Sequence, residues 1–303
     1  MSLLLQTAVE LGLISSLVVL ALFLSYSMLN VCDLSTDGCF TLGACTGAVV
    51  AIAGHPYLSI PAAILSGVCS GLITAVLQTL LGIDSLLSGI IVNTALFSVN
   101  IAIMGNSSLL NMNKTITIFT ILKDKLNTTI LNGRQTLIIS IFFVILVLIL
   151  LNLFLKTRMG LAIRATGDNP AMVKSSSINP TVTTIVGLCI SGGITALSGC
   201  LLAQSQKSVN IDIGSGILTI ALASLLIGRI LTRSNSLIIQ SICAVIGSII
   251  FRLIYTLALR LNMPAYMLRF ISSVIVVLAI GVPYLKQRYP EFKRRREAGR
   301  ENA

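Results

Sequence analysis

Charged residues are scarce in this sequence, and the side chains on which many catalytic and metal sites depend are scarcer still. Only 10% of the 303 residues are charged, one residue is a histidine, and tryptophan is absent. A soluble domain carries about 25% charged residues, so this composition does not fit a water-facing surface. Hydrophobic residues instead make up 55% of the chain. We therefore expect an integral membrane protein.

These scarcities also argue against an enzyme. A serine hydrolase needs a base beside its nucleophile, and the single histidine, His55, has no convincing serine partner. The seven cysteines are scattered in or next to apolar segments without a C-x-x-C pair, which favours apolar packing over a zinc site or disulfides. No glycine-rich loop with a lysine is present to cradle a phosphate. An intramembrane enzyme is thus the weaker hypothesis, and any ATP hydrolysis requires another chain.

What the sequence has is a succession of apolar runs. A helix needs about 20 apolar residues to cross the hydrocarbon core. Nine segments are candidates: 8–29, 44–54, 60–81, 86–105, 137–155, 181–203, 217–231, 237–259 and 266–283. Small residues within them allow close approach of neighbouring helices. We expect an all-α, polytopic helix bundle that forms one transmembrane domain over residues 1–285, followed by a basic tail at 286–303.

One polar stretch interrupts the first apolar runs. Residues 31–44 read VCDLSTDGCFTLGA, and a short apolar segment at 44–54 follows. This pattern is typical of a discontinuous membrane helix, whose irregular backbone is tolerated only where protein buries it or where it lines a cavity. A substrate path is one interpretation and an ordinary turn is the other. The candidate path residues are Asp33, Ser35, Thr36 and Asp37.

Three further polar residues are expected at membrane depth. Asn93 and Asn100 lie seven residues apart, so they share one helix face. Intramembrane amides more often bond a neighbouring helix than a ligand, but both asparagines are candidates for the path. Arg252 lies inside an apolar run, where a charge usually faces a cavity or reaches for the interface. It is a candidate contact for a substrate carboxylate.

The stretch at residues 156–180, KTRMGLAIRATGDNPAMVKSSSINP, is polar and basic between two apolar runs. Its pattern predicts a short helix, a turn at Gly167-Asp168-Asn169-Pro170, and a second short helix that ends near residues 179–180. Asp168 or Asn169 can cap the second helix, and Pro170 suits its first position because a missing N–H costs nothing there. We call residues 156–180 the elbow. A compact helical elbow suits docking to a soluble partner.

Basic residues indicate the orientation. The elbow, the tail, Arg229 and Arg233 hold most of the 21 lysines and arginines, and an even number of spans separates the elbow from the tail. The positive-inside rule places both in the cytoplasm and the loop 106–134 outside. The side of the N-terminus depends on whether 44–54 crosses the membrane or is re-entrant. The tail fits the anionic lipid surface, and no nucleic acid is expected.

Four stretches, in this order, resemble the permease subunits of bacterial ABC importers in the branched-chain amino acid, ribose and nucleoside superfamily. They are DLSTDGCFTLGA (33–44), LSGIIVNTALFSVNIAIMG (87–105), ATGDNPAMVKSSSINP (165–180) and LSGCLLAQSQKSVNIDIGSGILTIALASLLIG (197–228). The resemblance is closest to a subgroup that works with lipoprotein-type solute receptors, some of them linked to aromatic amino acids. It departs from the family at Ser175 to Ser177, where we expect small apolar residues, and at Arg229, where relatives often have an acid.

The resemblance implies a transport subunit in the bacterial cytoplasmic membrane. It implies a second permease copy, for which we expect a homodimer, two cytoplasmic ATP-binding subunits, and an extracytoplasmic lipoprotein that delivers the solute. ATP and magnesium would belong to the ATPase, with no cofactor in this chain. The elbow corresponds to the family's coupling helix, with the role carried by Gly167, Asp168, Asn169, Pro170, Met172 and Lys174.

The substrate remains open at this level. An amino acid, and among amino acids an aromatic one, is the first expectation, and a sugar or nucleoside is the alternative within the family. A carrier that works without an ATPase is a third hypothesis. Such a carrier needs acids embedded in the membrane as ion sites, and the apolar runs after residue 180 contain none.

Overall fold

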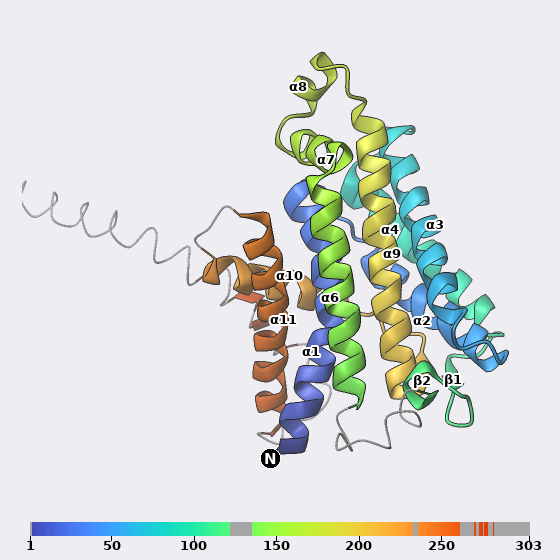
Figure 1. The fold of residues 1–303 in the computed structure, drawn as a ribbon. Helices are drawn as coiled ribbons and strands as arrows, with labels where there is room; N and C mark the ends of the chain where they lie inside the picture. The colour runs from blue at the N-terminus through green and yellow to red at the C-terminus, as the bar shows by residue number, and fades with distance from the viewer. Residues whose placement is uncertain are drawn as a thin grey trace, which may run out of the picture.

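The computed structural model describes residues 2–121, 135–232 and 236–260, together with a few single positions between 270 and 281. Within these residues the chain is an all-α bundle with one small two-stranded sheet (Figure 1). The elements are α1 (Ser2–Leu22), the π-helix η1 (Phe23–Met28), α2 (Thr36–Ile52), α3 (Ser59–Thr79), α4 (Ser85–Ile103), β1 (Leu109–Asn111), α6 (Gln135–Lys156), α7 (Arg158–Asp168), α8 (Pro170–Ser175), α9 (Pro180–Gln206), β2 (Ser208–Asn210), α10 (Ile217–Leu231) and α11 (Leu237–Arg260).

Six of the described helices are long and apolar enough to cross a membrane: α1 with η1, α3, α4, α6, α9 and α11. Two shorter apolar helices, α2 and α10, have 17 and 15 residues. Together they correspond to eight of the nine predicted segments. The ninth, 266–283, lies almost entirely outside the described residues, so the count of nine stays a prediction.

The bundle has two distinct ends (Figure 1). Helices α7 and α8 lie at one end, and the N-terminus, β1 and β2 lie at the other. Strand β1 pairs antiparallel with β2, which ties the segment after α4 to the segment after α9. We refer to these as the elbow end and the strand end.

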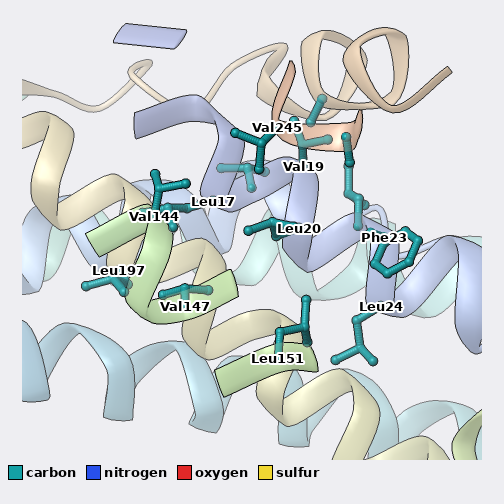
Figure 2. Close-up of a cluster of buried hydrophobic side chains, with 14 of the residues drawn as sticks. Leu17, Val19, Leu20, Phe23, Leu24, Val144, Val147, Leu151, Leu197 and Val245 are labelled. Atoms are coloured by element: carbon teal, nitrogen blue, oxygen red, sulfur yellow. The ribbon is translucent and has the colours of Figure 1, made fainter. Parts of the chain in front are cut away.

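Helices α1 and α9 form the centre. Each has about 72% of its most apolar window buried inside the protein, against about a third for α3, α6 and α11. Figure 2 shows part of this core, where Leu17, Val19 and Leu20 of α1 belong to one buried cluster with Val147 of α6 and Val245 of α11. In lipid, such helix contacts depend on close packing, because lipid tails are as apolar as leucine.

Small residues bring α2, α3 and α9 into direct backbone contact, as their sequences predict. Gly43 of α2 lies against the backbone of Ala196 in α9, and Gly67 of α3 lies against Gly192. Neither glycine has room for a Cβ atom. The three helices therefore form one tightly packed unit.

The discontinuous crossing is confirmed as a feature, but its predicted bounds are wrong. The helix begins at Thr36 rather than at residue 44, and the irregular stretch covers 29–35. Asp33 explains this start: its side chain accepts hydrogen bonds from the backbone N–H of Ser35 at 2.9 Å and from the Ser35 hydroxyl at 2.6 Å. The polar residues that follow Thr36 are small and pack inside the bundle as part of the helix.

A second interrupted crossing was not predicted. Between α9 and α10, residues 207–216 form β2 and a series of turns, with positive φ at Lys207 (53°) and Gly216 (84°). Helix α10 then starts against α2 inside the bundle. Two helices, α2 and α10, thus each begin after irregular backbone.

Candidate functional site

The starts of α2 and α10 meet at Asp37. One carboxylate oxygen of Asp37 accepts the backbone N–H of Leu218 at 2.8 Å, and the other accepts that of Gly216 at 2.9 Å. A glycine at the start of α10 has no side chain with which to cap the helix, so a residue from another helix supplies the cap. A carboxylate also suits the positive end of a helix dipole.

A cavity of about 310 Å³ lies beside this contact, and we call it the junction cleft. Its walls come from α2, α4 and the turns before α10. It is lined by Asp37, Gly38, Thr41, Ile90, Asn93, Thr94, Phe97, Asn100, Ile211, Asp212 and Ser215. Polar and apolar groups alternate around it, as in sites for small organic molecules.

Two asparagines of α4 face α2 across the cleft. Asn100 is 1% exposed, and its amide nitrogen donates a hydrogen bond to the carbonyl oxygen of Gly38 at 3.3 Å. Its amide oxygen is buried and has no hydrogen-bond partner. The side-chain oxygen of Asn93 lies 2.7 Å from the place that a Cβ atom on Gly38 would occupy. A glycine at position 38 therefore leaves room for the Asn93 amide.

Of the seven residues predicted to line a substrate path, the structure brings three together in the junction cleft: Asp37, Asn93 and Asn100. Asp33, Ser35 and Thr36 are buried in the turn before α2, where Thr74 of α3 donates a hydrogen bond to the Ser35 hydroxyl at 3.2 Å. Their hydrogen bonds join Asp33 to Ser35 and the Thr36 hydroxyl to the Asp33 carbonyl, so they hold a buried turn together.

Arg252 lies apart from this group. It belongs to α11, packs beside Gly12 of α1, and holds its guanidinium 5.4 Å from the centre of the Tyr255 ring. It does not line the junction cleft. The sequence reading also missed Asp212 and Ser215, for which the polar, glycine-containing run before α10 was the available signal.

The elbow consists of two short helices, as predicted, but the predicted four-residue turn is wrong: Gly167 and Asp168 still belong to α7, Pro170 begins α8, and only Asn169 separates the helices. Thr157 caps α7 by accepting the N–H of Gly160 at 3.3 Å. Asn169, one of the two predicted caps, accepts the N–H groups of Ala171 and Met172, both at 3.1 Å, and Pro170 takes the first position of α8. These local bonds define the start of the second helix.

The predicted end of that helix is wrong by several residues. Helix α8 stops at Ser175, and Ser177 adopts a left-handed conformation with φ 61°. The N–H of Ile178 then donates a hydrogen bond to the carbonyl oxygen of Val173 at 3.2 Å, which gives a carbonyl in the last turn of α8 a partner. Asn179 instead caps α9, where it accepts the N–H of Thr181 at 3.0 Å.

Helix α8 is the most outlying element at the elbow end (Figure 1). Asp168, Asn169, Pro170 and Lys174 are exposed, and Met172 is 66% exposed. Within the six residues of α8, Val173 alone is buried, at 3% exposed. The elbow thus presents a short helix to solvent and buries one of its side chains, Val173, where α8 meets α7 and α9.

The base of the elbow packs on the end of the first crossing. Gly167 lies against the backbone of Met28 and Leu29, with no room for a Cβ atom. A cleft of about 330 Å³ beside it is lined by both Asp168 of the elbow and Arg229 of α10. Helix α10 therefore starts beside the junction cleft and, through Arg229 in its last turn, lines a second cleft beside the elbow.

Comparison with known proteins identifies the class. The family model described as "Branched-chain amino acid transport system / permease component" matches residues 4–280. A "Tyrosine transport system permease protein" of Clostridioides difficile (strain R20291) is 35% identical over 274 residues, 89% of this chain and 88% of that protein. The "Uncharacterized protein RP368" of Rickettsia prowazekii (strain Madrid E) is 29% identical over 281 residues, 91% of this chain and 96% of that protein.

A further relative covers a part of the chain. The "Probable branched-chain amino acid transport permease protein LivH" of Methanocaldococcus jannaschii is 30% identical over 158 residues, 51% of this chain and 50% of that protein. No solved structure matches the chain significantly.

The helix bundle and these matches define a multi-pass membrane permease that acts as a transport subunit rather than an enzyme. The chain belongs to the branched-chain amino acid transport permease family, whose members are subunits of ABC importers. Membership implies a partner ATPase and a solute-binding protein, and location in the plasma membrane.

Proposed function

We propose that this chain forms the translocation path of an ATP-driven importer for an amino acid, with an aromatic amino acid as the first candidate. The observation that carries the substrate class is the 35% identity, over nearly the whole chain, to a protein named as a tyrosine transport permease. A lipoprotein-type receptor would deliver the solute. A homodimer of this chain would enclose the path, and ATP and magnesium would be held by two ATPase subunits.

The elbow is the proposed contact with the ATPase. An exposed helix of six residues, capped by Asn169 and held by the buried Val173, can enter a groove of a partner and transmit its movement without unfolding. Gly167 sits directly on the end of the first crossing, so a displaced elbow would move the bundle. A tightly packed bundle responds to such a push by switching between discrete arrangements.

The same proposal orients the protein. The elbow end, with the basic residues of the elbow and Arg229, would face the cytoplasm, and the strand end would face outside. The N-terminus of α1 lies at the strand end (Figure 1) and would therefore be extracytoplasmic. The junction cleft, between these ends, is the proposed segment of the substrate path.

Co-purification with the candidate ATPase tests the proposal. We expect the wild-type chain to retain the ATPase, and the double variant Asp168→Ala, Asn169→Ala to lose it or to lose transport-linked ATP hydrolysis. The matched control is Asn111→Ala, Asn113→Ala, which truncates two exposed polar side chains at the strand end. A wild-type chain that binds no ATPase, yet carries the solute by itself, would overturn the proposal in favour of a lone carrier.

A further inference from the structure

We propose that the junction cleft contains a subsite for a protonated amine, in which the amide oxygen of Asn100 accepts a hydrogen bond from a substrate ammonium group. The inference rests on the proposed function and deepens it, because it assigns part of the substrate selection to the permease itself. It predicts which end of an amino acid the cleft recognises.

The charges around the cleft favour a cation. Among the described residues that line it are two carboxylates, Asp37 and Asp212, and no lysine, arginine or histidine. Both carboxylate oxygens of Asp37 already accept backbone N–H groups at the start of α10, whereas Asp212 is exposed at the cleft. A cleft with acids and no base attracts a positive group and repels a free carboxylate.

Asn100 supplies an acceptor that the protein itself leaves unused. Its amide nitrogen is fixed by the hydrogen bond to the Gly38 carbonyl, so the amide oxygen is the remaining polar atom of that side chain. This oxygen is buried and has no hydrogen-bond partner within the part of the chain that the structure describes. Buried polar groups are ordinarily hydrogen-bonded, so an unmatched acceptor on a residue beside the cavity marks a place for a donor from a ligand.

The cleft is poorly equipped to hold a carboxylate. The backbone N–H groups at the start of α10, those of Gly216 and Leu218, would be the natural donors for an anion, but Asp37 already occupies them. Arg252 lies on α11 and does not reach the cleft lining. The ammonium end is therefore the one that this cleft can distinguish.

The remaining lining suits the rest of an amino acid. Ile90 and Phe97 of α4 offer apolar surface, and Thr94 lies between them. The volume of about 310 Å³ is at the lower end of the range of about 300–1,000 Å³ for small-molecule sites. One small amine with an apolar or aromatic side chain fits this description.

Binding of two esters to the full chain in nanodiscs tests the subsite. L-tyrosine methyl ester keeps the ammonium group, whereas N-acetyl-L-tyrosine methyl ester lacks it, and neither carries a free carboxylate. We expect saturation-transfer NMR, with empty nanodiscs as the blank, to show binding of the first ester at least about tenfold tighter than that of the second. Equal binding of the two esters, or no binding of either, would overturn the subsite.

Variants at Asn100 locate the effect. Asn100→Leu should weaken binding of the ammonium ester by about tenfold, because it removes the acceptor of the ammonium group. The control is Asn152→Leu, an identical change at a buried asparagine of α6 that bonds Ser241 of α11 away from the cleft. Wild-type affinity in Asn100→Leu would contradict the assignment. ATP-driven uptake of L-tyrosine, measured separately with the ATPase and receptor, reports on the proposed function independently of the subsite.

Discussion

Asp37 accepts the backbone N–H of Leu218 at 2.8 Å, although the two residues are 181 positions apart in the chain. This bond joins the starts of α2 and α10, the two helices that begin after irregular backbone. Irregular backbone at membrane depth requires protein partners for its polar groups, and here one interrupted helix satisfies the other. The contact between the starts of α2 and α10 therefore both stabilises these two helix ends and forms one wall of the junction cleft.

Removal of this cap should cost stability and transport together. We expect Asp37→Ala to lower the stability of the purified chain by about 1–2 kcal/mol, because two N–H groups at the start of α10 lose their acceptor. The measurement is thermal unfolding in detergent beside solute uptake in proteoliposomes. The control is Asp84→Ala, which removes the cap of α4, where Asp84 accepts the N–H of Leu86 at 2.9 Å. If transport fell equally in both variants, the junction would have no special role.

Gly38→Ala should narrow the junction cleft. The added Cβ would lie 2.7 Å from the side-chain oxygen of Asn93 and 3.1 Å from the Cβ of Leu96, so the amide must move. We expect transport to fall by roughly tenfold, in keeping with the cost of overpacking, while ATPase association is retained. Gly187→Ala is the control, because its Cβ would meet only flexible side-chain ends, the nearest being Leu29 at 3.2 Å. Unimpaired uptake in Gly38→Ala would exclude the cleft from the path.

The elbow was predictable because its signals are local. An asparagine before a proline, with helix-forming residues on both sides, specifies a cap and a first turn within four positions, and Asn169 and Pro170 occupy those places. The helix end was mispredicted because the turn after α8 places Ser177 in the left-handed conformation. Serine rarely adopts that conformation, so the sequence gives no signal for such a turn.

The junction was only half predictable. Asp37, Asn93 and Asn100 stood out because polar residues in apolar runs are rare, but their meeting with Asp212 depends on contacts far apart in sequence. The start of α2 was placed too late because polarity in a membrane segment suggests a loop. Within the bundle this stretch instead remains helical and packs against α9 through Cys39, Gly43 and Gly47.

Single cysteines should report the orientation. We expect Asn111→Cys, in β1 at the strand end, to react with a membrane-impermeant maleimide in intact cells. Ser176→Cys, exposed in the elbow, should react only after the cells are opened. The parent chain, which keeps its seven cysteines, provides the background. The reverse pattern would place the elbow outside and separate it from any cytoplasmic ATPase.

The buried and the exposed side chains of α8 should have different effects: the buried one on the transport obtained per ATP, and the exposed one on ATPase binding. Val173 is 3% exposed and fastens the helix, whereas the adjacent Met172 is 66% exposed and available to a partner. We expect Val173→Asp to leave the ATPase bound but to lower the transport obtained per ATP by about tenfold, because a charge cannot stay in that buried position and the helix detaches. Met172→Asp, with the same charge one residue away, should instead weaken ATPase binding itself. Co-purification and coupled assays in proteoliposomes separate the two effects.

If both variants lost the ATPase to the same extent, α8 would act as a simple docking surface. Movement of the ATPase would then reach the bundle by another route, such as the contact of Gly167 with the backbone of Met28.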